Sequence, residues 1–159
     1  MTGISFELDA GDINIAADKL DELAGFQRHE LLDMLGGMVA EQTKERIATE
    51  KTSPDGAPWK PNRRGGDILV LEGHLLSSID HQVSGNQAEV GSAMVYAAIH
   101  QHGGTIKAKS AKKLAFSAGN QMFFVDSVDI PARPYLGLSG GNIAELETEL
   151  GNWLEEKLQ

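Results

Sequence analysis

"RHELLDMLGGMVAEQTKERIATE" (residues 28–50) places apolar side chains at helical spacing over most of its length. Its apolar stripe consists of Leu31, Leu32, Leu35, Met38, Val39 and Ile47. Two glycines, Gly36 and Gly37, interrupt this pattern, and each costs about 1 kcal/mol relative to alanine in a helix. We therefore expect a long helix that either packs closely against another backbone or kinks at the glycines. Alternating charges over residues 44–51 predict a solvent-exposed last turn.

Segments on both sides of this helix predict a small antiparallel sheet. Residues 4–8 alternate apolar and polar side chains, as in a half-buried strand, and a helix is expected over about 12–24. A short helix is expected within residues 68–79, leading into a hairpin whose strands lie at about 78–84 and 87–92.

The chain beyond this hairpin predicts a short helix followed by an extended hairpin. "VYAAIHQHGG" (residues 95–104) is the short helix, and β-like segments follow at 105–109, 112–117 and 122–130. One face of the last segment is expected to carry Met122, Phe124, Val128 and Ile130.

A final amphipathic helix is predicted near the C-terminus. Asn142 is its expected N-cap. Its apolar face consists of Ile143, Leu146, Leu150, Trp153 or Leu154, and Leu158. The order of elements predicts one α+β domain over residues 1–159, with N- and C-terminal helices packed on a small antiparallel sheet.

A loop rich in proline and glycine separates the long helix from the hairpin. Residues 52–67 contain three of the five prolines, and "SPDG" at 53–56 predicts a β-turn. Trp59 lies in the middle of this loop. The indole either pins the loop to the domain or anchors a partner.

Composition narrows the classes of partner. The 159 residues include no cysteine, which excludes disulfides and thiolate metal sites. No apolar run is long enough for a membrane span, and the N-terminus does not resemble a secretion signal. The net charge of −9 disfavours nucleic acid as a partner. Acidic ends and a mildly basic middle suit either self-association, with one subunit's acidic helix meeting the next one's basic loop, or solubility alone.

The two histidines of "YAAIHQHGG" raise the question of a metal or catalytic site. On a helix, residues two apart point about 200° away from each other, so His100 and His102 would not share a metal ion. Gly103 is expected to supply a left-handed C-terminal cap, and Tyr96 is expected to face the fold beside His100. A metal-dependent hydrolase that uses the two histidines and a distant acid is the less favoured alternative. The sequence contains none of the common nucleophile, zinc-protease or phosphate-loop motifs, so no catalytic residue, metal ligand or cofactor is predicted.

One basic patch stands out in this acidic chain. "KAKSAKK" contributes Lys107, Lys109, Lys112 and Lys113. These lysines could contact a phosphate backbone or an acidic subunit face, or they could protect an exposed edge strand from aggregation.

Four sequence blocks occur in order: "SPDGAPW" (53–59), "LVLEGHLLSSI" (69–79), "AEVGSAMVYAAIHQHGGTI" (88–106) and "IPARPYLGLS" (130–139). Together they resemble the phage virion morphogenesis family, which includes tail completion proteins of P2-like phages and the G protein of Mu-like phages. The resemblance runs from about residue 30 to the end. Glu72 replaces a usual threonine and His102 a usual aromatic residue.

The resemblance implies a non-enzymatic virion assembly protein in the tail or neck region of the virion, made in the host cytoplasm. Related neck proteins form rings, commonly hexamers, that meet the tail tube or the head–tail connector. A head-side connector or adaptor is the alternative. No membrane contact is expected, and any DNA contact would be incidental, in the virion channel. Residues 52–67 and 105–121 are expected to be flexible or to become ordered on assembly.

The resemblance identifies one set of residues, and a hypothesis about assembly contacts identifies a second. The signature positions are Pro54, Asp55, Gly56, Trp59, Gly73, Tyr96, His100, Gly103, Gly104, Pro131, Arg133, Pro134 and Gly137. The residues expected to contact neighbouring subunits or the tail tube are Trp59, Lys107, Lys109, Lys112, Lys113 and Arg133. Arg133 has an alternative, which is pairing with an acid inside its own fold.

Overall fold

The computed structural model describes residues 4–9, 28–63, 65–109, 112–118 and 120–158. Its elements in chain order are β1 (Ile4–Asp9), α2 (Arg28–Glu45), the π-helical turn η2 (Arg46–Glu50), α3 (His74–Ser77), β2 (Ile79–Ser84), β3 (Gln87–Ser92), α4 (Ala97–His102), β4 (Gly104–Lys107), β5 (Leu114–Ala118), β6 (Gln121–Val125), β7 (Ser127–Ile130) and α5 (Gly140–Lys157). Helices and antiparallel strands together confirm the α+β class. The helix expected over 12–24 lies outside the described residues.

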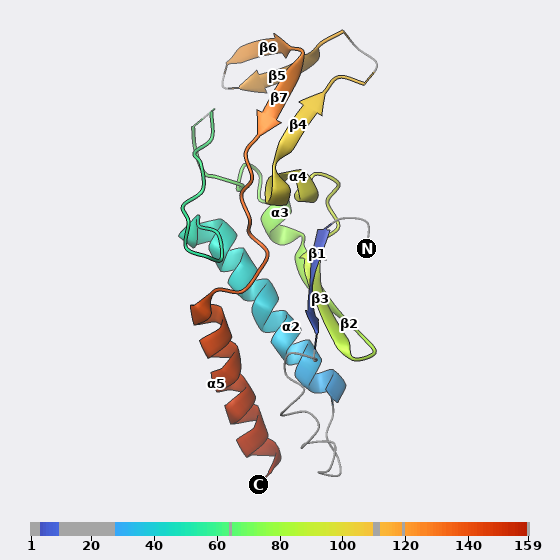
Figure 1. Ribbon diagram of the computed structural model, residues 1–159, viewed down its shortest axis with the longest axis vertical. Helices are drawn as coiled ribbons and strands as arrows, with labels where there is room; N and C mark the ends of the chain where they lie inside the picture. The colour runs from blue at the N-terminus through green and yellow to red at the C-terminus, as the bar shows by residue number, and fades with distance from the viewer. Residues whose placement is uncertain (1–3, 10–27, 64, 110–111, 119, 159) are drawn as a thin grey trace.

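The long helix α2 packs on a three-stranded antiparallel sheet in the order β1-β3-β2 (Figure 1). Its leucines and Val39 are buried, as the stripe predicts. At Gly36 an added Cβ would lie 2.8 Å from Cδ2 of His81 and 3.3 Å from Cβ of Ala88. Close packing is therefore present at Gly36, but it is against side chains of the hairpin and not against another backbone as predicted, and Gly37 has only an ordinary contact at 3.6 Å.

The predicted hairpin is confirmed as β2 and β3, whose register runs from Ile79 opposite Ser92 to Ser84 opposite Gln87. β1 adds to the other edge of β3 in antiparallel register, from Ile4 opposite Ser92 to Asp9 opposite Gln87. The strand expected at 4–8 is thus confirmed. The sheet offers α2 a face on which Ala88 and Val90 are fully buried.

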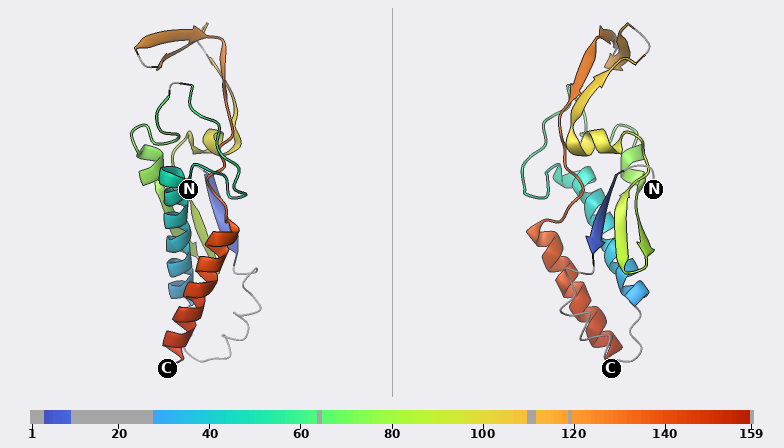
Figure 2. Two further views of the ribbon diagram at one scale, coloured as in Figure 1. Left: turned by 90° about the vertical axis from the view of Figure 1, so that its left-hand side faces the viewer. Right: turned by 45° about the vertical axis from the view of Figure 1, so that its right-hand side comes forward.

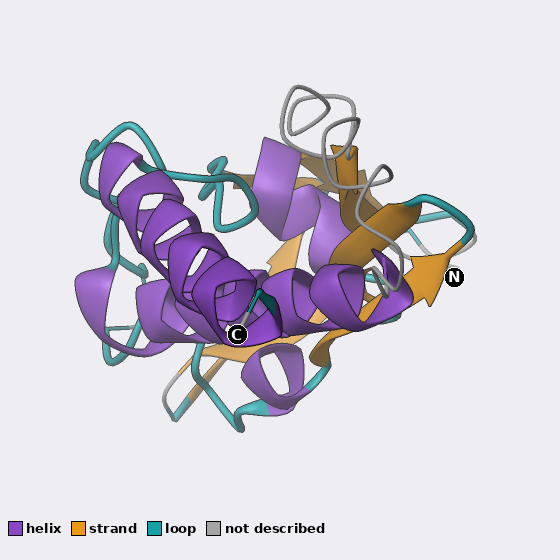
Figure 3. Cartoon of the chain, turned by 90° about the horizontal axis from the view of Figure 1, so that it is seen from below, coloured by secondary structure: helices purple, strands orange, loops and turns teal. Residues whose placement is uncertain are grey.

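The C-terminal helix α5 lies alongside α2, as Figure 3 shows from below. Leu146 and Trp153 are buried, and Lys157 pairs with Glu30 at 2.9 Å, joining the end of α5 to the first turn of α2. Two details of the prediction are wrong. The N-cap is Ser139, whose side chain accepts a hydrogen bond from the Asn142 backbone N–H, so Asn142 is the third helical residue of a capping box. The ends of the expected apolar face, Ile143 and Leu158, are exposed.

The predicted solvent-exposed end of the long helix is confirmed for Glu45 and for residues 48–50, but it is wrong for Arg46, which is fully buried. Ile47 is fully buried too, as the apolar stripe predicts, and the helix widens here into the π-helical turn η2. Lys51 ends it in a left-handed conformation, with φ 56° and ψ 32°. The alternating charges indicate solvent because they do not reveal that Arg46 bonds to a segment about 90 residues further along the chain.

The extended hairpin is present as an arm, residues 104–130, that projects from the end of the body near α4 (Figures 1 and 2). β4 and β7 form its two-stranded stem, and β5 and β6 form a second pair at its far end. The β-like segment expected over 122–130 is divided at Asp126 into two strands of different sheets. None of the described helices is long and apolar enough to cross a membrane.

Candidate functional site

The extended segment after β7, residues 131–138, belongs to the fourth signature block, and residues of the blocks at 53–59 and 88–106 contact it. Arg46 reaches it from η2. One terminal guanidinium nitrogen of Arg46 donates to the carbonyls of Tyr135, at 2.9 Å, and Gly137, at 2.8 Å, and the other donates to Oδ1 of Asn142. Burial lowers the pKa of the guanidinium, and Glu50, with a carboxylate oxygen 3.5 Å from Nε, opposes that shift.

Gln101 of α4 holds the same segment from the other direction. Its Oε1 accepts hydrogen bonds from the backbone N–H groups of Tyr135, at 2.9 Å, and Leu136, at 3.0 Å. Its Nε2 donates to the carbonyl of Leu136 at 3.3 Å. The Tyr135 hydroxyl, fully buried, donates to the carbonyl of Ala97 at 3.0 Å, and burial raises the pKa of this phenol above its usual value. We call Arg46, Gln101 and Tyr135 the clasp.

The loop over 52–67 is attached to the same segment. Nε1 of Trp59 donates to the carbonyl of Pro134 at 3.1 Å, and the indole is 6% exposed. Near the start of the loop, Cγ of Pro54 lies only 2.9 Å from the position that a Cβ on Gly137 would take. Gly137 also has φ +128°, so a side chain at this position would be strained as well as crowded.

Arg133 is likewise used inside the subunit. It is 5% exposed, and its guanidinium donates to the carbonyls of Lys60, at 2.9 Å, and Pro61, at 3.3 Å. The expectation that Trp59 and Arg133 contact a neighbouring subunit therefore finds no support in their geometry. Instead, the alternative in which Trp59 pins the loop to the domain is confirmed, and both residues fix the loop against residues 131–138.

The histidine cluster forms a corner of the fold. His100 packs edge-on against Tyr96, with ring centroids 5.8 Å apart, whereas His102 is exposed. Gly103 ends α4 with φ 71° and ψ 180°, which is a glycine conformation but not the left-handed helical one predicted. A Cβ on Gly103 would lie 2.7 Å from the backbone nitrogen of Ala132 and 2.9 Å from the carbonyl oxygen of Ile130. The first residue of the arm, Gly104, follows Gly103, and its last residue, Ile130, packs against Gly103.

Metal-binding geometry is not found at this corner. Among the residues that the structure describes, no three histidine or acidic side chains lie close enough together to hold a metal ion. The two imidazoles lie in different environments, since His100 is partly buried against Tyr96 and His102 is exposed. The arrangement therefore gives the metal-dependent hydrolase no site built from His100 and His102.

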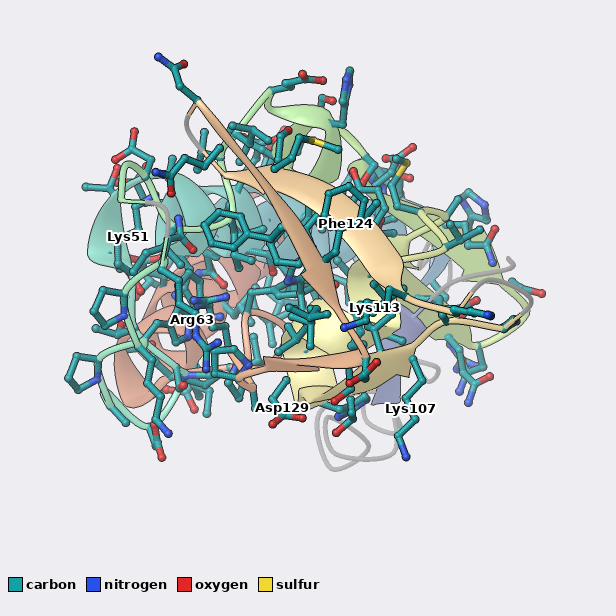
Figure 4. All side chains as sticks on the ribbon, turned by 90° about the horizontal axis from the view of Figure 1, so that it is seen from above. Lys51, Arg63, Lys107, Lys113, Phe124 and Asp129 are labelled. Atoms are coloured by element: carbon teal, nitrogen blue, oxygen red, sulfur yellow. The ribbon has the colours of Figure 1, made fainter. Side chains whose placement is uncertain are left out.

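The arm carries the predicted lysines, and all four are exposed. Figure 4, which looks down on the arm, labels Lys107, Lys113 and Phe124 on it. Phe116 and Phe123 stack at 5.6 Å between ring centroids and line a cleft of about 1130 Å³ between the arm and the body. Met122 and Phe124 are each 61% exposed. The arm thus has an inner aromatic face toward the body and an outer apolar face toward solvent.

The clasp residues Arg46 and Gln101 were missed as site residues from the sequence. Gln101 lies within the signature block around "IHQHGG", and that context could have marked it. Arg46 lies in a stretch of alternating charge that resembles a solvated surface, so no local signal distinguishes it. Asn142 was recognised as a helix-capping residue, but its bond to Arg46 depends on a contact across 96 positions of sequence.

Comparison with known proteins agrees with the resemblance drawn from the four blocks. The model of the phage virion morphogenesis family matches residues 8–155. The "Mu-like prophage FluMu G protein 2" of Haemophilus influenzae is 30% identical over 149 residues, covering 92% of each chain. The "Putative capsid assembly protein G" of Escherichia phage Mu is 32% identical over 146 residues, covering 80% of this chain and 84% of its own. No solved structure shows a significant match.

Proposed function

The chain belongs to the phage virion morphogenesis family, and from this premise we propose that it is a non-enzymatic subunit acting at the tail end or the head–tail junction. Its role in phage virion assembly, within the host, comes with the family. The position in the particle, the ring and the partners are the parts that we propose. A ring of identical subunits, with six as the expected number, would meet the tail tube, the head–tail connector or both.

The arm is the observation that carries this proposal. The signature blocks do not assemble a set of reactive groups. Gln101 and Gly103 of the block at 88–106 hold residues 131–138 and the base of the arm, and Arg46 of η2 holds the same segment from outside the blocks. Since the arm exposes apolar side chains and lysines beyond this rigid base, the fold is suited to presenting a contact surface to other proteins.

Deletion of residues 107–113 tests the proposal in the phage that encodes this chain. We expect the deletion variant to fold, because the clasp and core do not use these residues, and to fail to complement a null mutation in plaque formation. Circular dichroism and thermal unfolding of the purified variant check that the body is intact. A matched control replaces the exposed Val95, which lies off the arm, with serine and should complement fully. Infectious particles made with the deletion variant would overturn the proposal.

A head-side connector or adaptor is the second candidate, because the name of the phage Mu relative refers to capsid assembly. Electron microscopy of lysates from the null mutant separates the two positions. Filled heads beside free, abnormally ended tails would place the subunit at the tail. Complete tails beside heads that are empty or have lost DNA would place it at the head.

A further inference from the structure

The two faces of the β5–β6 pair have different surroundings. The register places Phe116 opposite Phe123, and this pair lines the cleft toward the body. Because successive side chains of a strand point to opposite faces, Met122 and Phe124 lie on the other face. Both are 61% exposed, and Lys112 and Lys113, also exposed, lead directly into β5. The outer arm face therefore presents two large apolar side chains, and two exposed cations lie next to it, immediately before β5.

A surface of complementary chemistry lies on the body. A shallow groove between α2 and α5 is lined by Met38, Ala144, Glu145, Thr148 and Glu149. Met38 and Ala144 give it an apolar floor, and the exposed carboxylates of Glu145 and Glu149 lie at its rim. α5 as a whole carries five glutamates and one lysine, so the groove lies in the most acidic described part of the chain.

We propose that the outer arm face of one copy binds the α2–α5 groove of a second copy, with Met122 and Phe124 on the apolar floor and Lys112 and Lys113 beside Glu145 and Glu149. This inference rests on the self-association in the proposed function and names the surfaces that make it. Charge complementarity identifies the occupant, because the groove is acidic and the chain's own arm is its basic, apolar projection.

The positions of the two surfaces determine what kind of assembly they form. The arm projects at one end of the long axis, whereas α5 lies along the other half of the molecule (Figure 1). The arm therefore extends away from its own groove, and the contact joins two different patches on two copies. Such a heterologous contact leaves one free arm and one free groove on every dimer, so it propagates into a ring if the rotation closes.

Two single-surface variants test the contact with purified full-length protein. Phe124→Thr keeps a residue suited to a strand while removing the ring, and Glu145→Lys with Glu149→Lys reverses the charge of the groove. Sedimentation velocity over a range of concentrations should show oligomers for the unaltered chain and association weaker by about tenfold or more for each variant. Matched controls are Val95→Ser, an exposed apolar residue elsewhere, and Glu155→Lys with Glu156→Lys, which reverses two charges on the same helix; both should associate as the unaltered chain does.

Mixing the two variants is the most specific measurement. Each variant retains the surface that the other has lost, so an equimolar mixture should form a dimer and stop there, at concentrations at which the weakened association leaves each variant alone monomeric. A mixture that stays monomeric would overturn the proposal, and so would a Phe124→Thr variant that associates as tightly as the unaltered chain, or an unaltered chain that stays monomeric at all concentrations. Met122→Thr, on the same face, provides a second arm variant with the same expected outcome.

The outcomes separate this inference from the proposed function. If Phe124→Thr abolishes virion completion but leaves association unchanged, the arm contacts another virion protein and the groove contact is wrong, while the assembly role stands. If the mixing result is obtained but the variants and the null mutant all give normal particles, the contact is real and the proposed function is wrong.

Discussion

The body buries polar side chains, whereas the arm exposes apolar ones. In the body, the guanidinium of Arg46 and the phenol of Tyr135 are completely buried, and each is bonded to backbone carbonyls. In the arm, Met122 and Phe124 leave most of their surface in solvent. A buried charge is costly unless its hydrogen bonds are made, and an exposed apolar cluster is costly unless a partner covers it. The body therefore bonds the terminal nitrogens of Arg46 and the Tyr135 hydroxyl internally, whereas the arm leaves two large apolar side chains for another molecule.

This difference separates the residues that determine folding from those that determine association. The signature residues lie mainly in the first group, because they hold residues 131–138 and the base of the arm. The arm surface lies in the second. If this division is correct, substitutions in the clasp should change the free energy of unfolding, and substitutions at the arm tip should not.

The largest effect is expected at Arg46. Arg46→Met would remove the donors to three buried acceptors and should lower the free energy of unfolding by about 3–5 kcal/mol. Urea unfolding followed by tryptophan fluorescence measures the change. Arg63→Met, in the exposed part of the proline-rich loop, is the matched control and should change stability by less than about 0.5 kcal/mol. Similar small losses for both variants would show that the clasp does not hold the fold.

Gly103 comes next. Gly103→Ala would push a methyl group against the backbone of Ala132 and Ile130 at a positive φ, and should cost about 2–4 kcal/mol. Gly151→Ala on α5, where no atom lies within 4 Å of the added Cβ, should instead raise stability by up to about 1 kcal/mol. Thermal unfolding of the two variants measures both changes in stability. Equal behaviour of the two variants would contradict the crowding described at the base of the arm.

The contribution of Tyr135 to the stability of the fold should depend on pH. Because burial raises its pKa in the folded chain above the unfolded value of about 10, its contribution to stability is complete below that pH and declines as the pH rises further. Tyr135→Phe should cost about 1 kcal/mol at pH 8, through the lost bond to Ala97. The gap in melting temperature between the two proteins should narrow above pH 10. A constant gap from pH 8 to pH 11 would argue against a buried phenol.

Much of the body could be predicted from the sequence because its signals are local. The stripe around Leu35 predicts α2, and alternation with a turn predicts β2 and β3. The contacts that hold residues 131–138 could not be predicted, because they join positions far apart in the sequence, such as Arg46 and Tyr135, 89 positions apart. Local charge patterning even indicated the opposite environment for Arg46.

The surface of the arm could be predicted only in part. The lysines and the hairpin are visible as composition and alternation. The division at Asp126, which places β6 and β7 in different sheets, depends on how the strands pair and has no strong local signal. For the same reason the sequence grouped Phe124 with Val128 and Ile130, although the stem and the far end of the arm carry these residues separately.

Substitutions at the paired glycines of α2 should change stability by smaller amounts, and they test how closely the helix fits the sheet. At Gly37 an added Cβ would be 3.6 Å from the His81 ring, an ordinary contact, so Gly37→Ala should gain up to about 1 kcal/mol of helix stability. At Gly36 the same methyl group would be 2.8 Å from that ring, which is held by Asp33 at 3.0 Å. Gly36→Ala should therefore lose about 1 kcal/mol net. Denaturant midpoints with opposite signs for the two variants are the expected result, and equal gains would show that the helix can move off the hairpin.

The smallest change in the free energy of unfolding is expected at the arm tip. A large change there would contradict the division between residues for folding and residues for association. Phe124→Thr should change the free energy of unfolding by less than about 0.5 kcal/mol, because the ring is mostly in solvent and threonine suits a strand. Leu35→Ala in α2, which also removes one large apolar side chain, should cost about 2–5 kcal/mol, because Leu35 is 1% exposed. Both are measured by urea unfolding at a protein concentration low enough to keep the chain monomeric. If Phe124→Thr cost as much as Leu35→Ala, the outer arm face would belong to the fold, and its apolar residues would need no second molecule to explain them.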